Sequence, residues 1–237
     1  MTEIAVALDV ESLDQALELE RRLGEGPELA KVGLQLFGNA GPEVVRALRA
    51  RGRRVFLDLK LHDIPNTVWG AAAAAARLGA ELITVHALGG AAMVGAAVEG
   101  AASAGGRTEV VAVTLLTSLE PQNLPPGFER PFALHRRLAE MLEMAERSGA
   151  RGIVCSAADL PGVREFHPAP FFAVTPGIRP AGLAAHDQRR VTTPGEAVRL
   201  GSSLIVVGRS ITDQADPRAA LERVRAECQA AVSSVRG

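Results

Sequence analysis

Short runs of apolar, often β-branched residues recur along the chain, and a segment with helical character follows each of them. Because strands that alternate with helices form parallel βαβ units, this order predicts an α/β fold. The runs expected to be strands are Ile4–Leu8, Ala30–Leu34, Val55–Leu59, Leu82–His86, Val110–Leu115, Gly152–Ser156, Phe171–Thr175 and Leu204–Val207. The segments expected to be helices are Leu13–Leu23, Pro42–Arg51, Asn66–Leu78, Ala91–Ala104, Leu134–Ser148, Ala158–Phe166, Pro194–Leu200 and Asp216–Val232.

Eight such units are the number that closes a (β/α)8 TIM barrel, and a chain of 237 residues is close to the usual size of that fold. A doubly wound open sheet is the alternative. No G-x-G-x-x-G sequence follows the first expected strand, however, and that sequence would support a dinucleotide-binding sheet. No Pro/Ser-rich linker or low-complexity segment divides the chain. We therefore expect one (β/α)8 barrel domain over residues 1–237.

Alternation within the first three strands predicts which side chains face the barrel interior. In Val55–Leu61 the aliphatic residues occupy every second position and would pack against the helices. The second strand likewise places Val32 and Leu34 opposite its polar positions. The residues expected to face inward are Ala5, Ala7, Asp9, Lys31, Gly33, Phe56, Asp58 and Lys60. The charged ones lie near the C-terminal ends of the strands, where active sites of this fold are found.

Two lysines and two aspartates in this region alternate in charge: Lys31, Asp58, Lys60 and Asp63. Because an isolated buried charge costs several kcal/mol, opposite charges here would offset one another. One interpretation is an ion-pair network that only closes the top of the barrel. The other is catalysis: a fixed carboxylate repels a substrate carboxylate, loss of CO2 relieves that repulsion, and a lysine protonates the carbanion that remains. We favour decarboxylation.

Two late segments, each after an expected strand, carry arginine and glycine. They are Pro176–Arg179, which continues to Gln188, and Val207–Ser210. The loops after the seventh and eighth strands build a phosphate site in many barrels. Gly208 would let backbone N–H groups approach an anion, and Arg179 and Arg209 could bind its oxygens. The stretch 180–188 is rich in small residues and is expected to close over a ligand.

Composition and charge narrow the class of protein. The net charge of −1 and the pI near 6.5 argue against a nucleic-acid binder. The two cysteines, Cys155 and Cys228, form neither a metal-ligand spacing nor a disulfide framework, which favours the cytoplasm. The N-terminus has no secretory signal pattern, and the alanine run 71–76 is too short to cross a bilayer. We therefore expect a cytoplasmic protein with neither a membrane nor a nucleic-acid partner.

The run Asp58–Thr67, with the pattern D-x-K-x-x-D-I-P-N-T, resembles the signature of the orotidine 5′-phosphate decarboxylase family. The resemblance covers almost the whole chain, in the expected order. The further segments that carry it are Ala7–Asp9, Lys31–Gly33, Leu116–Ser118, Pro176–Arg179, Asp187–Gln188 and Val207–Arg209. It implies a homodimeric (β/α)8 barrel that converts orotidine 5′-phosphate to UMP and CO2, the last step of pyrimidine synthesis. It also implies that no metal, flavin or other cofactor takes part.

By this resemblance Lys60 protonates C6 of the pyrimidine, and Asp58 faces the departing carboxylate. Lys31 and Asp63 complete the alternating array. The resemblance also implies that Asp63 reaches into the neighbouring subunit's site and that Thr67 contacts the nucleotide there. The catalytic chemistry would thus depend on both subunits.

The same resemblance assigns the remaining substrate contacts. Asp9 and Lys31 would hold ribose hydroxyls. Thr117 or Ser118 would meet the pyrimidine, and the adjacent pair leaves the choice open. The residues assigned to the phosphate are Arg179, Gln188, Gly208 and Arg209.

Other reactive residue types have plainer interpretations. His62 and His86 belong to no nucleophile motif, so that packing or solvent contact is expected of them. Cys155 is expected to be a small barrel residue. Trp69, in the helix after the signature, could belong to the core or to the dimer interface, and we favour the interface because the neighbouring Asp63 and Thr67 are expected to cross it.

Two other functions compete with the first. Relatives that share D-x-K-x-x-D, such as keto-gulonate phosphate decarboxylase and hexulose phosphate synthase, act on sugar phosphates with Mg²⁺. They are expected to carry an acidic residue where this chain has Lys31, and a lysine would repel the ion. The third possibility is a sensor that binds a nucleotide without catalysis, but carboxylates beside an anionic ligand give a pure binder no advantage.

Overall fold

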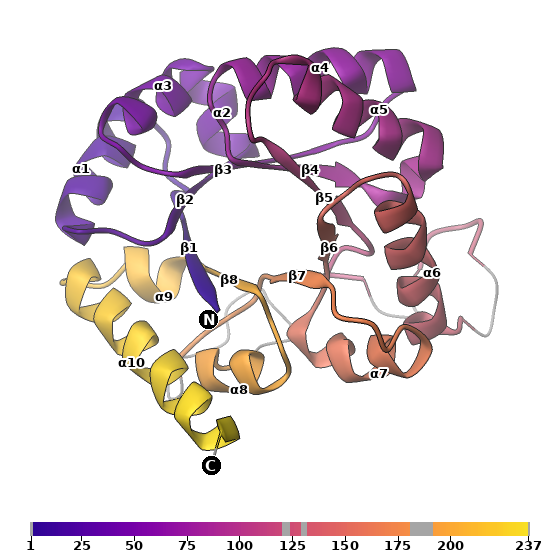
Figure 1. The fold of residues 1–237 in the computed structure, drawn as a ribbon. Coiled ribbons are helices and arrows are strands. Elements are labelled where there is room, and N and C mark those ends of the chain that lie inside the picture. Colours follow the sequence, from indigo (N-terminus) through magenta and orange to yellow (C-terminus); the bar gives the residue numbers. More distant parts are fainter. Residues whose placement is uncertain (1, 120–123, 129–131, 181–191, 237) are drawn as a thin grey trace.

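Eight parallel strands close into one barrel in the order in which they occur along the chain (Figure 1). The computed structural model describes residues 2–119, 124–128, 132–180 and 192–236. The strands are β1 (Glu3–Ala7), β2 (Leu29–Gly33), β3 (Val55–Leu61), β4 (Leu82–His86), β5 (Glu109–Val113), β6 (Gly152–Val154), β7 (Phe172–Thr175) and β8 (Leu204–Val207). The predicted (β/α)8 fold is confirmed, with strand ends shifted by one or two residues.

Helices surround the barrel and cover the outer face of the sheet (Figure 1). They are α1 (Leu13–Leu23), α2 (Leu34–Ala40), α3 (Glu43–Ala50), α4 (Pro65–Arg77), α5 (Gly90–Ser103), α6 (Leu134–Arg147), α7 (Leu160–Phe166), α8 (Pro194–Arg199), α9 (Arg209–Thr212) and α10 (Pro217–Arg236), with 3₁₀ turns η1 (Ala87–Gly89) and η3 (Ala157–Asp159). The sequence did not predict α2, α9 or the 3₁₀ turns. They are too short to show a helical period, and each begins within three residues of the end of a strand.

Alternating strand positions separate two apolar layers. The layer inside the barrel consists of Ala5, Ala7, Leu29, Phe56, Leu82, Val111, Val174, Leu204 and Val206. Ile4, Val6, Val55 and Leu57 belong to the layer between the strands and the helices, which confirms the predicted facing of β1 and β3. Leu34 is different. Strand β2 ends at Gly33, so that Leu34 begins α2 and is 63% exposed instead of packing beside Val32.

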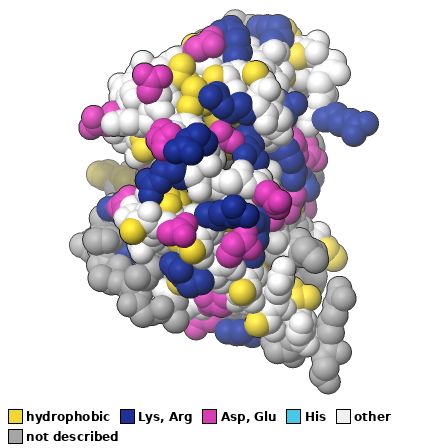
Figure 2. Space-filling view, turned by 90° about the vertical axis from the view of Figure 1, so that its left-hand side faces the viewer, with side chains coloured by type: hydrophobic (Ala, Val, Ile, Leu, Met, Phe, Trp, Pro, Cys, Tyr) yellow, Lys and Arg dark blue, Asp and Glu magenta, His cyan; other side chains and the backbone are white. Residues whose placement is uncertain are grey.

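The face that includes α1, at the left of Figure 1, has a mixed charge pattern. Figure 2 shows Lys/Arg and Asp/Glu side chains interspersed over it, and neither sign forms a continuous patch there. Exposed pairs one helical turn apart contribute to this pattern, among them Arg21–Glu18 in α1 and Arg46–Glu43 in α3. Such exposed pairs add little to stability but keep the surface soluble.

Candidate active site

A cavity of about 610 Å³ opens among the C-terminal ends of the strands. Its floor is the inner apolar layer, including Phe56, Val174 and Val206. The predicted site residues that line it are Asp9, Lys31, Asp58, Lys60, Thr117, Arg179, Gly208 and Arg209. These residues come from segments that are far apart in the sequence, and the closure of the barrel brings them to one rim.

A second hollow, of about 800 Å³, lies among the loops that precede strands β4 and β5, at the opposite end of the barrel. Small residues and arginines such as Gly79, Gly106, Arg49 and Arg107 line it. In this fold chemistry belongs to the C-terminal end of the strands, while the other end serves stability. The smaller cavity is therefore the candidate active site.

Asp58 lies between the two lysines of the site, and its side chain is only 13% exposed. Lys60 Nζ lies 2.8 Å from each Asp58 carboxylate oxygen, and Lys31 Nζ lies 3.6 Å from Oδ2. Lys31 Nζ also lies 3.4 Å from Asp9 Oδ1. Burial alone would raise the pKa of Asp58, but the charges of Lys31 and Lys60 and the hydrogen bonds lower it below its ordinary value. Asp58 is therefore an ionised carboxylate enclosed with two ammonium groups.

Both lysines of the chain lie in this array, although Lys and Arg together number 26. Every other strongly basic residue is an arginine. An arginine does not give up its proton near neutral pH, whereas an ammonium group can do so and is compact enough to approach a reacting carbon. Lys31 and Lys60 therefore bring the two lysine side chains of the chain together beside Asp58.

The backbone at Lys60 departs from regular strand geometry. Lys60 has a φ of 50°, a positive value that is unusual for a residue with a side chain. Such a conformation costs on the order of 1 kcal/mol and is found mainly at functional sites. The Lys60 N–H donates to Thr84 Oγ1 at 2.8 Å instead of to a neighbouring strand carbonyl. Sequence patterns did not single out Thr84, a polar residue in the otherwise apolar first four positions of β4.

Asp63 and Thr67 lie apart from this array. Asp63 is exposed, and its Oδ1 accepts a hydrogen bond from the Ile64 N–H at 2.6 Å. Neither residue lines the cavity in the described part of the chain. The predicted grouping of Asp63 with Lys31, Asp58 and Lys60 at one rim is thus not found among the described residues of this single chain.

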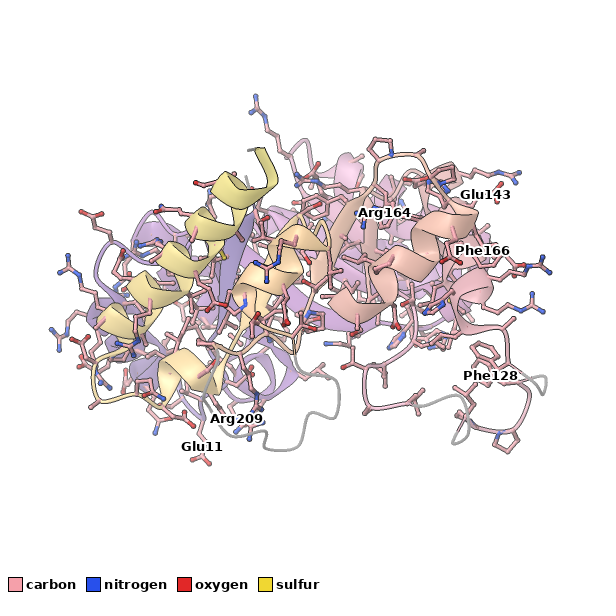
Figure 3. All side chains as sticks on the ribbon, turned by 90° about the horizontal axis from the view of Figure 1, so that it is seen from below. Glu11, Phe128, Glu143, Arg164, Phe166 and Arg209 are labelled. Atoms are coloured by element: carbon pink, nitrogen blue, oxygen red, sulfur yellow. The ribbon has the colours of Figure 1, made fainter. Side chains whose placement is uncertain are left out.

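The other end of the cavity carries the residues predicted to bind phosphate. Arg179 follows β7 and is 7% exposed, and Gly208 and Arg209 follow β8. A Cβ placed on Gly208 would come no closer than 3.6 Å to Ala7 Cβ, an ordinary contact, so that packing within the chain does not demand a glycine. In Figure 3 Arg209 and Glu11 both lie toward the lower edge of the molecule, and Arg164 and Glu143 lie higher in the view.

Two site predictions can be compared with the cavity wall only in part. Thr117 lines the cavity, and Ser118 is not among its lining residues, so that Thr117 has the better position of the pair. Gln188 and the predicted closing loop after Pro180 lie outside the described residues.

His86, at the end of β4, lies beside the array and next to the exposed His62. The His62 and His86 ring centroids are 5.3 Å apart, and His86 Nδ1 is buried with no hydrogen-bond partner among the described residues. Burial lowers the pKa of His86 below its ordinary 6.5, and the charges of His62 and Lys60 lower it further. His86 is therefore neutral at pH 7.

This lowered pKa predicts a pH-dependent stability. Because the unfolded chain binds a proton more readily than folded His86, His86 costs no stability above about pH 7 and an increasing amount as the pH falls below 6.5. Relative to wild type, His86→Gln should gain stability at pH 5 by under about 1 kcal/mol, since the ring is partly solvated. Urea denaturation of both proteins at pH 8 and pH 5 measures the difference, and parallel pH dependences would contradict it.

Cys155 is buried in the outer layer, and burial raises its thiol pKa far above the ordinary value. The predicted packing role is the one its environment supports. In the described residues no group of three His, Cys, Asp or Glu side chains could hold a metal ion. The helices searched in the same residues include none that is both long and apolar enough to cross a membrane.

Three comparisons bear on the family. The profile of the "Orotidine 5'-phosphate decarboxylase / HUMPS family" matches residues 2–224. The orotidine 5′-phosphate decarboxylase of Cutibacterium acnes is 45% identical over 225 residues, which cover 95% of each chain. That of an Anaeromyxobacter species is 49% identical over 225 residues, or 94% of this chain and 96% of the relative.

A solved structure gives the same result at the level of the fold. The crystal structure of orotidine 5′-phosphate decarboxylase from Lactobacillus acidophilus superimposes with a TM-score of 0.84 and 38% identity. The superposition covers 96% of this chain and 99% of that one. The barrel, the signature in β3 and these matches over nearly the full length agree, and the chain belongs to the orotidine 5′-phosphate decarboxylase / HUMPS family.

Proposed function

We propose that this protein is an orotidine 5′-phosphate decarboxylase, which converts orotidine 5′-phosphate to UMP and CO2 as the last step of pyrimidine nucleotide synthesis in the cytoplasm. The observation that carries the proposal is an ionised carboxylate, Asp58, held between Lys31 and Lys60 in the same cavity as Gly208 and Arg209. The curated relatives that the chain matches carry this name.

In the proposed reaction Asp58 faces the carboxylate on C6 of the bound pyrimidine. The repulsion between the two anions raises the energy of the bound substrate and vanishes when the C6–carboxylate bond breaks. The bonding electron pair stays on C6, and CO2 leaves as a neutral molecule. The Lys60 ammonium stabilises the carbanion and then donates a proton to C6, after which the neutral amine takes a proton from solvent.

The other site residues would bind and orient the nucleotide. Asp9 and Lys31 hold ribose hydroxyls, and Thr117 meets the pyrimidine. The phosphate is assigned to Arg179, Gln188, Gly208 and Arg209. Because the phosphate does not react, its binding energy is available to hold the carboxylate against Asp58.

We further propose that the reaction needs no cofactor. A Mg²⁺-dependent reaction on a sugar phosphate, as in the relatives that share D-x-K-x-x-D, is the second candidate. Lys31 Nζ lies 3.6 Å from Asp58 Oδ2 and would repel a divalent cation at that carboxylate. The charge of the site therefore favours the nucleotide reaction.

The experiment that tests this function uses protein treated with a chelator. Orotidine 5′-phosphate is added, and conversion to UMP is followed by ultraviolet absorbance. A hexulose phosphate or keto-gulonate phosphate is assayed in parallel, with and without Mg²⁺. Turnover of the nucleotide without added metal is expected. Nucleotide turnover that requires Mg²⁺, or turnover of a sugar phosphate alone, would reject the proposal.

We also propose that two copies of the chain form a dimer with shared active sites. Large apolar side chains are exposed just after strands β2 to β5, around the C-terminal rim. They are Leu34, Ile64, Trp69, Leu88 and Leu116, each at least 40% exposed. Ile64 and Trp69 flank Thr67, and Ile64 adjoins Asp63. A second copy that binds this surface would cover the apolar side chains. Asp63 and Thr67 of each copy would then lie at the cavity of the other copy.

A shared site predicts complementation between two inactive variants. In a mixed dimer of Lys60→Ala and Asp63→Ala subunits, one cavity combines an intact Lys60 with the partner's intact Asp63. Random pairing should therefore restore about a quarter of wild-type activity, since half of the dimers are mixed and each has one intact site. Coexpression followed by the decarboxylation assay measures this.

The matched control pairs Lys60→Ala with Asp58→Ala. Both changes affect the cavity of their own subunit, so that no mixed dimer contains an intact site and the mixture should stay inactive. If the Lys60→Ala and Asp63→Ala mixture is equally inactive, Asp63 does not serve the neighbouring site.

A further inference from the structure

Strands β3 and β4 lose their regular pairing at the catalytic residues. Leu57 pairs with Ile83 and Leu61 pairs with Val85, so that three residues of β3 lie opposite a single residue of β4. The three residues are 58–60, and the single one is Thr84. A bulge of this kind redirects side chains but leaves backbone groups of the bulged strand without their usual partners. Thr84 lies directly opposite these residues on β4, so that its side chain can bond the backbone groups that the bulge leaves unpaired.

The Thr84 hydroxyl contacts both catalytic residues at once. It accepts a hydrogen bond from the Lys60 N–H at 2.8 Å and donates one to Asp58 Oδ1 at 2.9 Å. Thr84 is 1% exposed, so that solvent does not compete for either bond. A hydroxyl is the smallest side-chain group that can accept and donate a hydrogen bond at the same time. Because threonine is β-branched, its χ1 rotation is restricted and its hydroxyl is held in place.

We propose that Thr84 is a positioning residue for the decarboxylation: its hydroxyl fixes the Asp58 carboxylate and the bulged Lys60 backbone in the geometry that the reaction requires. This inference rests on the proposed function. Thr84 does not line the cavity, and it acts on the substrate only through Asp58 and Lys60.

The need for such a residue follows from the charges in the site. A substrate carboxylate placed against Asp58 pushes the Asp58 side chain away, and any retreat would remove the repulsion that favours loss of CO2. The lysines attract Asp58, but their flexible ammonium groups can follow it. The Thr84 hydroxyl is fixed on the neighbouring strand, so that its hydrogen bond resists a movement of the Asp58 carboxylate. The same hydroxyl holds the Lys60 backbone at its positive φ, which sets the direction of the proton donor.

The alternative is that Thr84 only fills space. Valine has nearly the same shape as threonine and would keep a packing role. Loss of a packing role would affect folding more than catalysis. A positioning role requires the hydroxyl and is kept by serine. The two roles therefore differ in which substitution is tolerated and in which kinetic constant changes.

The test compares Thr84→Val and Thr84→Ser with wild type and with Thr175→Val. Thr175 is a matched control because it is a fully buried barrel threonine whose hydroxyl bonds Ser202 Oγ at 2.9 Å, away from the array. Thr84→Val should lower kcat for orotidine 5′-phosphate by about 10- to 100-fold and change KM by less than about threefold. Thr84→Ser and Thr175→Val should keep kcat within about threefold of wild type.

A second measurement does not depend on turnover. Because the chain has only two lysines, protein labelled with ¹⁵N-lysine gives two backbone amide signals, and Lys31 serves as the internal reference. Thr84→Val should speed hydrogen exchange at the Lys60 amide by at least about tenfold and leave Lys31 unchanged, because the Lys60 N–H loses its acceptor.

The outcomes separate the two proposals. An inactive wild type would reject the proposed function, and with it the catalytic role of Thr84. An active wild type with a fully active Thr84→Val variant would overturn the positioning role alone. So would a Thr84→Ser variant as impaired as Thr84→Val, or an unchanged exchange rate at the Lys60 amide.

Discussion

Replacing Lys60 with alanine is expected to lower kcat for orotidine 5′-phosphate by at least about 10⁴-fold, because in the proposed reaction this one side chain supplies both the proton and most of the charge that stabilises the carbanion. Lys60 Nζ lies 2.8 Å from both oxygens of Asp58, the carboxylate that is proposed to face the substrate carboxylate. No other ammonium group can take over, because Lys31 is the only other lysine and lies on a different strand.

The loss must be shown to be chemical and not structural. Circular dichroism and thermal unfolding should show a folded Lys60→Ala barrel, since the Lys60 side chain is 30% exposed and Lys60 is not a member of either apolar layer. Binding of UMP should remain measurable, because the residues proposed to bind the phosphate follow β7 and β8 and are left unchanged. A Lys60→Ala variant that retains a tenth or more of wild-type kcat would remove the role assigned to Lys60.

Replacing Arg209 with alanine is expected to lower kcat/KM for orotidine 5′-phosphate by about 10²- to 10³-fold, although Arg209 contacts no reacting atom. Pyrimidine C6 has no electron sink, so that the barrier is high and remote binding energy must contribute to lowering it. An arginine bound to a phosphate in a partly closed cavity can supply energy of this size through charge-assisted hydrogen bonds.

The substrate without its phosphate provides the control for Arg209. With orotidine, Arg209→Ala and wild type should have nearly equal kcat/KM values, because the missing side chain has nothing to bind. The matched variant Arg21→Ala, in an exposed pair on α1, should behave as wild type with both substrates. An Arg209→Ala variant that is as efficient as wild type with the nucleotide would show that the phosphate lies elsewhere.

Much of the site could be predicted because side chains alternate between the two faces of a strand, and this alternation shows which residues face the barrel interior. Alternation in β3 predicts Asp58 and Lys60 on the inner face, and both side chains lie in the cavity wall. The same rule failed at Leu34, where the strand ends one residue earlier and a short helix begins. Local period thus predicts the facing of a side chain but not the residue at which a strand stops.

The contacts that the sequence did not reveal are those between strands. Thr84 contacts Lys60 because β3 bulges at this position. The register between two strands cannot be predicted from the sequence of either strand alone. The exposed position of Asp63 has the same character, since its proposed partner lies in another chain. The scarcity of lysine, by contrast, is a property of the sequence itself, and it supports the assignment of Lys31 and Lys60 independently of any contact between strands.

The central claim is that the lysine–aspartate array and the glycine–arginine turn bind the two ends of one nucleotide. A crystal structure of the protein with UMP tests this most directly. The account predicts that the phosphate contacts the backbone of Gly208 and Arg209 and the Arg209 side chain. It also predicts that pyrimidine C6 lies within about 4 Å of Lys60 Nζ, the distance that proton transfer to carbon requires. A UMP molecule bound elsewhere, or bound with C6 turned away from Lys60, would contradict it.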